Sequence, residues 1–71
     1  MERYANKSGN SPITSFQIEI ESITVWFGSK QYTYSYSGRA GSLHVEAMKK
    51  LAKSGSGLSA YITRNVKYLY D

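Results

Sequence analysis

Five basic residues in the second half of the chain have the types and spacing that suit an anionic partner. They are Lys49, Lys50, Lys53, Arg64 and Lys67. Tyr61, Tyr68 and Tyr70 lie nearby in the sequence, and no acidic residue lies between Lys49 and Lys67, although Glu46 comes just before them. Basic side chains combined with stacking rings are what proteins use to hold single strands. We therefore predict that these five residues bind RNA or DNA; the alternative is an ordinary solvated helix face.

The distribution of charge supports this prediction. Residues 1–38 carry equal numbers of basic and acidic side chains, whereas residues 39–71 carry six basic and two acidic ones and hold the whole net charge of +4. An excess of positive charge attracts anionic partners. No known sequence-reading motif is present, so nucleic-acid binding is expected to address the phosphate backbone and to weaken as salt rises.

Trp26 indicates a second candidate surface. The alternation of the surrounding residues places Trp26 on the sheet face opposite the core, flanked by Gln17, Gln31 and Thr33. An exposed tryptophan on an open sheet suits a partner protein or a stacked base, so we predict partner binding by Trp26, Gln31 and Thr33. Two alternatives remain open: the N-terminal segment covers Trp26 through Tyr4, or two sheets pair in a homodimer.

Residues suited to catalysis or metal binding are scarce. The chain has no cysteine and one histidine, His44, which stands two positions before Glu46. Residues two apart on a helix point to nearly opposite sides, so His44 and Glu46 should not act together. A histidine in a first helical turn is expected to cap the helix or to face solvent. The sequence therefore predicts that the protein is not an enzyme and holds no metal ion and no cofactor.

Three runs of alternating apolar and polar residues, at 16–20, 23–27 and 32–36, predict antiparallel strands that each bury one face. The turn between the first two runs, at 19–22, lacks glycine, proline and asparagine. One long bent strand over 16–27 is therefore an alternative to two strands.

Between the second and third runs, Gly28-Ser29 suits a two-residue type II′ hairpin turn. With this pair at the tip, Val25 faces Tyr32 and the alternation is consistent on both faces of the hairpin. Tyr32, Tyr34 and Tyr36 share the apolar face with Val25. We therefore predict that these tyrosines pack in the core with their hydroxyls at its rim, and a stacking platform is the alternative.

Beyond a flexible loop at 37–41, the apolar spacing changes to that of a helix. Gly41 or Ser42 can cap it, and its apolar face holds Val45, Met48, Leu51 and Ala52. Residues 54–57, Ser-Gly-Ser-Gly, end this helix, and a second apolar face follows with Leu58, Tyr61, Ile62 and Val66. The predicted fold is α+β, a three-stranded antiparallel β-meander followed by two C-terminal α-helices packed on one face (β-β-β-α-α).

The strand runs Ile13-Thr14-Ser15-Phe16, Ile23-x-Val25-x-Phe27 and Tyr32-x-Tyr34 resemble those of the KTSC domain, a small domain also found at the C-terminus of some lysyl-tRNA synthetases. The family's stretch Ser-Lys-Gly-x-x-Phe-Asn-x-x-Ile is similar to residues 53–62, where Gly55, Leu58 and Ile62 take the glycine, aromatic and isoleucine places. The resemblance implies a KTSC-like α+β domain and, because of the tRNA-handling neighbour, a binding accessory.

We predict a flexible N-terminal lead-in over 1–12 and a single domain over 13–71. The sequence shows no signal peptide and no apolar run long enough to span a membrane, so a cytoplasmic protein without a membrane partner is expected. The predicted function is a small non-enzymatic module that binds nucleic acid through its basic C-terminal helices. The alternative is a protein-interaction or self-associating module that uses Trp26 and the open sheet face.

Overall fold

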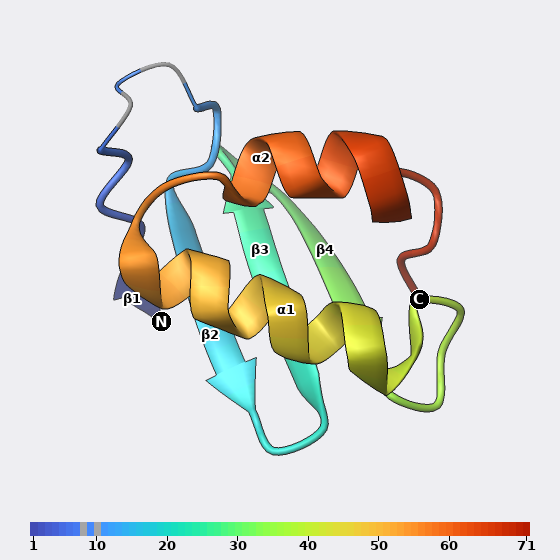
Figure 1. Ribbon diagram of the computed structural model, residues 1–71. Helices are drawn as coiled ribbons and strands as arrows, with labels where there is room; N and C mark the ends of the chain where they lie inside the picture. Colours follow the sequence, from blue (N-terminus) through green and yellow to red (C-terminus); the bar gives the residue numbers. More distant parts are fainter. Residues whose placement is uncertain (8, 10) are drawn as a thin grey trace.

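The computed structural model describes residues 1–7, 9 and 11–71 of the chain as a sheet covered by helices (Figure 1). Ser8 and Asn10, which fall within the predicted lead-in, lie outside the described residues. In chain order the elements are β1 (Glu2–Arg3), β2 (Ser15–Glu19), β3 (Ser22–Phe27), β4 (Lys30–Ser35), α1 (Gly41–Ser54), α2 (Leu58–Tyr61) and the π-helical turn η1 (Ile62–Val66). The four strands form one antiparallel sheet in the order β1-β2-β3-β4.

The predicted hairpin register is confirmed. Val25 pairs with Tyr32 across β3 and β4, and both residues lie on the apolar face. Gly28 has a φ of +68° at the tip, a conformation that glycine adopts without steric cost and that the first position of a type II′ turn requires. The alternative of one long bent strand over 16–27 is wrong, because Glu19 pairs with Ser22 and so closes a separate β2–β3 hairpin.

The three-strand prediction is wrong by one strand, because the N-terminal segment adds β1 to the edge of β2. Tyr4 directly follows β1 and is buried, with 3% of its surface exposed. Its hydroxyl accepts a hydrogen bond of 3.3 Å from the backbone N–H of Leu58. The backbone N–H of Lys7 donates a 2.7 Å hydrogen bond to the carbonyl of Gly55. A two-residue strand has no periodicity to read, so only the tertiary contacts of Tyr4 identify this segment as part of the packed structure.

Helix α1 buries the predicted face, with Val45, Met48 and Ala52 packed in the core. The predicted cap at Gly41 or Ser42 is wrong, because the helix begins at Gly41 with Ala40 as its N-cap, and no side-chain hydrogen bond caps its start. Gly55 ends the helix in the left-handed conformation, with a φ of +83°, and its N–H donates to the carbonyl of Leu51.

The second helix differs from the regular α-helix that was predicted. Only four residues are α-helical, and the chain then widens into the π-helical turn η1. The buried residues Leu58, Ile62 and Val66 recur every fourth position. An α-helix advances by more than a full turn in four residues, so this spacing drifts around its surface. The wider π turn reduces the drift and keeps Ile62 and Val66 on the face that contacts the sheet.

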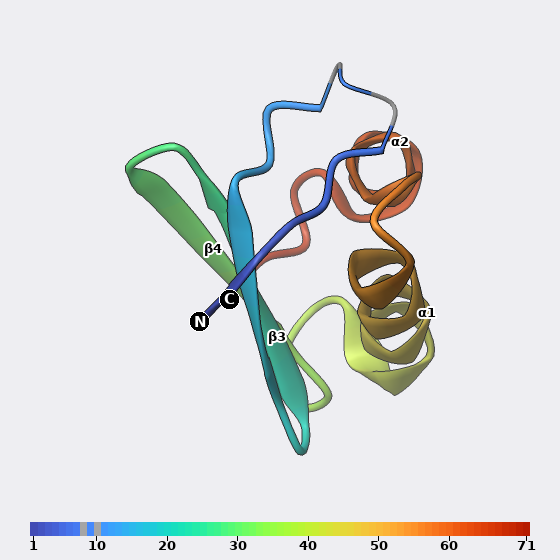
Figure 2. The same ribbon diagram turned by 90° about the vertical axis from the view of Figure 1, so that its left-hand side faces the viewer.

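Both helical segments cover the same face of the sheet, as the side view in Figure 2 shows. The core between the layers contains apolar residues from β2, β3, β4 and both helices. The opposite sheet face carries no helix among the described residues. Within the same residues, no helix is both long and apolar enough to cross a membrane.

The junction between the N-terminal segment and the end of α1 yields a stability prediction. A Cβ on Gly55 would lie 2.6 Å from the Cβ of Ala5, whereas a Cβ on Gly28 would meet nothing within 4 Å. Because both glycines have positive φ, Gly28→Ala should lower the free energy of unfolding by about 1–2 kcal/mol. Gly55→Ala should cost a further 1–3 kcal/mol, roughly, through overpacking.

Urea denaturation of both variants measures the difference, and adding Ala5→Gly to Gly55→Ala should recover part of the steric loss. Equal losses in the two single variants, with no recovery in the double variant, would contradict the packing of the N-terminal segment against Gly55.

Candidate functional site

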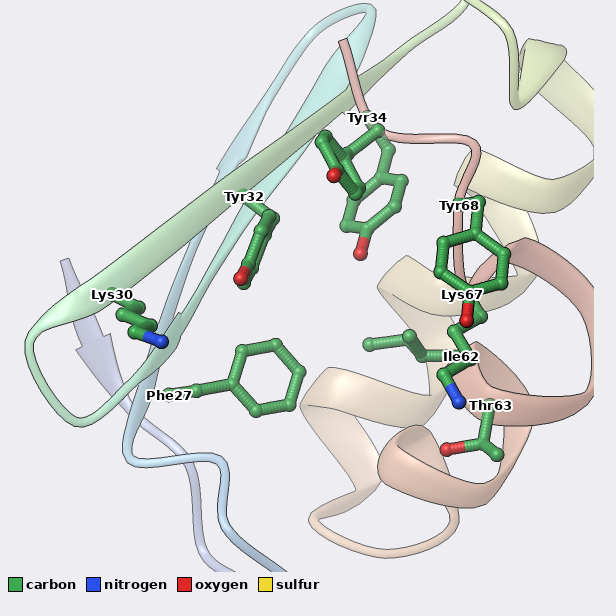
Figure 3. A pocket seen from close by; sticks show the side chains of 9 residues that line it. Phe27, Lys30, Tyr32, Tyr34, Ile62, Thr63, Lys67 and Tyr68 are labelled. Carbon is green, nitrogen blue, oxygen red and sulfur yellow. The ribbon is translucent and has the colours of Figure 1, made fainter.

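A pocket of about 380 Å³ lies at the tip of the β3–β4 hairpin, between β4, η1 and the C-terminal residues (Figure 3). The residues that line it are Phe27, Lys30, Tyr32, Tyr34, Ile62, Thr63, Lys67, Tyr68 and Tyr70. Five of these nine residues are aromatic, two are basic and none is acidic. The pocket therefore offers ring surfaces and positive charge to a ligand.

The alternation of the hairpin explains which strand residues reach the pocket. Phe27 pairs with Lys30, and both point to the same side of the sheet as the Val25–Tyr32 pair, which is the helix-facing side. The helical layer ends at Val66. Figure 2 shows the tip of the hairpin apart from the helical layer, and its helix-facing side chains remain partly open.

The rings of Phe27, Tyr32 and Tyr70 form a continuous aromatic wall. The centroids of Phe27 and Tyr32 are 5.7 Å apart in an edge-to-face arrangement, and those of Tyr32 and Tyr70 are 4.8 Å apart. Tyr70 is held in place by the segment on either side of it. The N–H of Leu69 donates to the carbonyl of Val66, and the N–H of Asp71 donates to the carbonyl of Thr33 on β4.

Tyr34 forms the buried base of the pocket, with 1% of its surface exposed. Burial, together with the neighbouring Tyr32 and Tyr70, raises the pKa of Tyr34 to about 12. All three tyrosines line the pocket. No hydrogen bond to the Tyr34 hydroxyl is found among the described residues, and the structure contains no fully buried polar side-chain atom without a partner among them. The hydroxyl is therefore accessible from the pocket.

Lys67 is the one member of the predicted basic set that lines the pocket, where it is joined by Lys30. The Nζ of Lys67 lies 5.4 Å from the centroid of the Tyr68 ring. Such a contact orients the ammonium group while leaving it free to bind an anion.

Lys49 is instead engaged at the opposite end of the sheet. Its Nζ lies 2.9 Å from the carboxylate of Glu46 and 2.9 Å from the carbonyl oxygen of Ile20, in the β2–β3 turn. The same carboxylate accepts a hydrogen bond from the Tyr36 hydroxyl, and that bond, followed by the one from Lys49, lowers the pKa of Glu46. The ammonium of Lys49 is therefore committed to internal partners. The length of β3, about 17 Å, separates this end of the sheet from the tip of the β3–β4 hairpin.

The three other predicted residues, Lys50, Lys53 and Arg64, are exposed on the outer sides of the helices. None of them lines the pocket. The pocket retains only Lys67 from the set.

Trp26 lies on the uncovered face of the sheet, in a cross-strand row with Arg3, Ser15 and Gln31. Trp26 is half-buried and does not line the pocket. Covering by Tyr4 is wrong, because Tyr4 is buried with the core residues and bonded to Leu58 on the other side of the sheet.

Thr33, the third predicted partner-binding residue, lies on the same face as Trp26, where its hydroxyl is 2.9 Å from that of Thr24. The Trp26 surface and the pocket therefore lie on opposite faces of the same hairpin.

His44 and Glu46 have separate partners, as predicted. The Nδ1 of His44 lies 2.7 Å from the hydroxyl of Tyr61, so the histidine links α1 to α2 and is neither a helix cap nor fully solvated. Neither residue lines the pocket. Within the described part of the chain, no three His, Asp or Glu side chains come close enough together to hold a metal ion.

The three tyrosines of the third alternating run, Tyr32, Tyr34 and Tyr36, have different surroundings. Tyr34 packs in the core as predicted, Tyr32 contributes to the pocket wall, and Tyr36 bonds to Glu46. Sequence reasoning missed Phe27 and Lys30 as site residues. The signal for Lys30 was present, since the confirmed register puts a charged side chain on the otherwise apolar face.

Comparison with known proteins adds no assignment: no family model, no curated protein and no solved structure matches this chain. The resemblance to the KTSC domain therefore stays a prediction.

The base of the pocket gives a pH-dependent prediction. Because the pKa of Tyr34 is raised to about 12 in the folded protein, its ionisation favours the unfolded chain between pH 10 and 12. This contribution to stability is intact below pH 10 and is lost as pH rises toward 12. Tyr34→Phe should remove this part of the loss, and absorbance titration of the tyrosines should lack the last ionisation. An unchanged alkaline titration in the variant would contradict the burial of this hydroxyl.

Proposed function

We propose that this protein is a small non-enzymatic module that binds single-stranded RNA or DNA through the pocket at the hairpin tip. The observation that carries the proposal is the combination of an aromatic wall with two lysines and no acid in one pocket. Every nucleobase has a flat face that stacks on aromatic side chains, and every nucleotide of a strand has a phosphate for a lysine. The lining also lacks the histidine and carboxylates that general acid–base catalysis uses, which supports a binding role.

The proposed interface is narrower than the basic helical surface predicted from the sequence. Two lysines contact about two phosphates, and for a single strand each phosphate contributes a slope of about −0.7 to the salt dependence. A roughly fourfold rise in salt concentration should therefore weaken binding about sevenfold. Stacking, which depends little on salt, would supply the rest of the affinity, at about 1–3 kcal/mol per base.

A relationship to the KTSC domain and a cytoplasmic location, where such strands are present, belong to the same proposal. Neither is required by the chemistry of the pocket.

Fluorescence anisotropy with a labelled single-stranded oligonucleotide tests the proposal. The double variant Lys30→Gln/Lys67→Gln should lose about tenfold in affinity and most of the salt dependence, because both phosphate contacts are removed. The matched control Lys50→Gln/Lys53→Gln removes the same charge from α1 and should bind nearly as the wild type does. Equal losses in the two double variants would mean that only net charge matters, which would contradict a site at the pocket.

The uncovered sheet face supports a second candidate function, self-association. Arg3 and Trp26 lie on this face in one cross-strand row at the Ser15 end of β2, and Glu19 lies on it at the other end. In a twofold dimer of antiparallel sheets, the arginine of each copy can approach the glutamate of the other, and each tryptophan then packs on the row of Glu19 and Ser22 in the partner sheet.

Sedimentation velocity over a wide concentration range tests this candidate. Self-association that is lost in Trp26→Thr would support the dimer. A wild type that stays monomeric at the highest concentration would exclude it and would leave a different protein as the occupant of this face.

A further inference from the structure

We infer that the pocket takes one nucleotide of a strand, with its base against the aromatic wall and one phosphate at each rim. The smallest ligand that uses the whole site is then a nucleoside 3′,5′-bisphosphate. This inference rests on the proposed binding of nucleic acid and specifies the unit that is recognised.

The two lysines define the rims. Lys30 enters from the hairpin and Lys67 from the position that follows η1, and in Figure 3 Phe27 lies between them. The ammonium groups therefore approach the pocket from different sides and do not form a single anion site. A nucleotide within a strand has a phosphate on its 5′ side and another on its 3′ side. A base inserted at the centre places these phosphates on opposite sides of it, which matches the separation of the lysines.

The size of the pocket limits the ligand to one base. A volume of about 380 Å³ is near the lower end of the range of roughly 300–1,000 Å³ that small-molecule sites occupy. The rings of Tyr32 and Tyr70 are inclined by 53° to each other, so they form an angled wall and not a long flat platform. A single ring fits against such a wall, whereas a stack of several bases needs successive parallel surfaces.

The hydroxyl groups at the base of the pocket suit the polar edge of a nucleobase. Tyr34 is almost fully buried, and its hydroxyl has no partner among the described residues. Tyr32 and Tyr70 lie close enough to influence its ionisation. A tyrosine hydroxyl both donates and accepts hydrogen bonds, and base edges present both kinds of group. These hydroxyls would distinguish a base from an apolar ring of the same size.

Calorimetric titration with a graded series of small ligands tests the inference. The ligands are adenosine, adenosine 5′-monophosphate and adenosine 3′,5′-bisphosphate, with inorganic phosphate as the ring-free control. Each added phosphate should tighten binding about threefold to fivefold at low salt, the range of an exposed ion pair. Inorganic phosphate alone should not bind measurably, because it gains nothing from the aromatic wall.

Variants of one lysine at a time show which of the two phosphates each lysine binds. Lys30→Gln and Lys67→Gln should each remove the gain from one phosphate and keep the gain from the other, so that the bisphosphate binds each variant about as the monophosphate binds the wild type. Lys50→Gln is the matched control and should keep both gains. Far-ultraviolet circular dichroism establishes that each variant is folded. Tyr34→Phe should weaken all three adenosine ligands by a similar factor, because the hydroxyl contacts the base.

The outcomes separate this inference from the proposed function. Equal affinities for the monophosphate and the bisphosphate would overturn the two-rim arrangement. Binding of an oligonucleotide without binding of any small ligand would overturn the inference and leave the proposed function standing. Failure of the oligonucleotide and of all the small ligands to bind would overturn both.

Discussion

The burial of one sheet face by two short helical segments is the constraint on which the rest of this structure depends. A chain of 71 residues has little core to spare, and its interior is made almost entirely at this one interface. Helix α1 has 14 residues and is about 21 Å long, and it packs across β3 and β4. The second helical segment ends at Val66. The tip of the β3–β4 hairpin lies apart from these helical segments (Figure 2), and the pocket forms between the hairpin, η1 and the C-terminal residues.

The parts of the fold that depend on local pattern could be predicted from the sequence. Strict alternation and a Gly-Ser turn determine the β3–β4 register, since a slip of one residue would have exposed the apolar face. The helix that ends at Gly55 is determined in the same way, by spacing and a terminating glycine. β1 and the π turn could not be predicted. They depend on the burial of Tyr4 and on the alignment of Ile62 with Val66 against the sheet, which are tertiary requirements.

In the candidate site, too, some features follow from local sequence pattern and others depend on tertiary contacts. Nearness in sequence suggested one basic surface, but Lys49 binds Glu46 and the Ile20 carbonyl and does not line the pocket that Lys67 lines. The residues that do gather come from three separate segments: the hairpin, η1 and the C-terminal tail. The tail is fixed by backbone hydrogen bonds from Leu69 and Asp71, which no side-chain pattern announces. The local signs of this site were Lys67 beside Tyr68 and Tyr70 in the sequence and the alternation that places Lys30 on the apolar face.

Binding at the pocket is tested most directly by mapping the contact surface by nuclear magnetic resonance, using ¹⁵N-labelled protein and a short single-stranded oligonucleotide. If the strand binds in the pocket, the largest shifts of the amide signals fall at residues 27–32 and 62–71, around the hairpin tip, η1 and the tail. The amides of Lys49, Lys50 and Lys53 and the indole of Trp26 should change little. Shifts concentrated on the outer side of α1 or around Trp26, with the pocket unperturbed, would contradict the claim and assign binding to another surface.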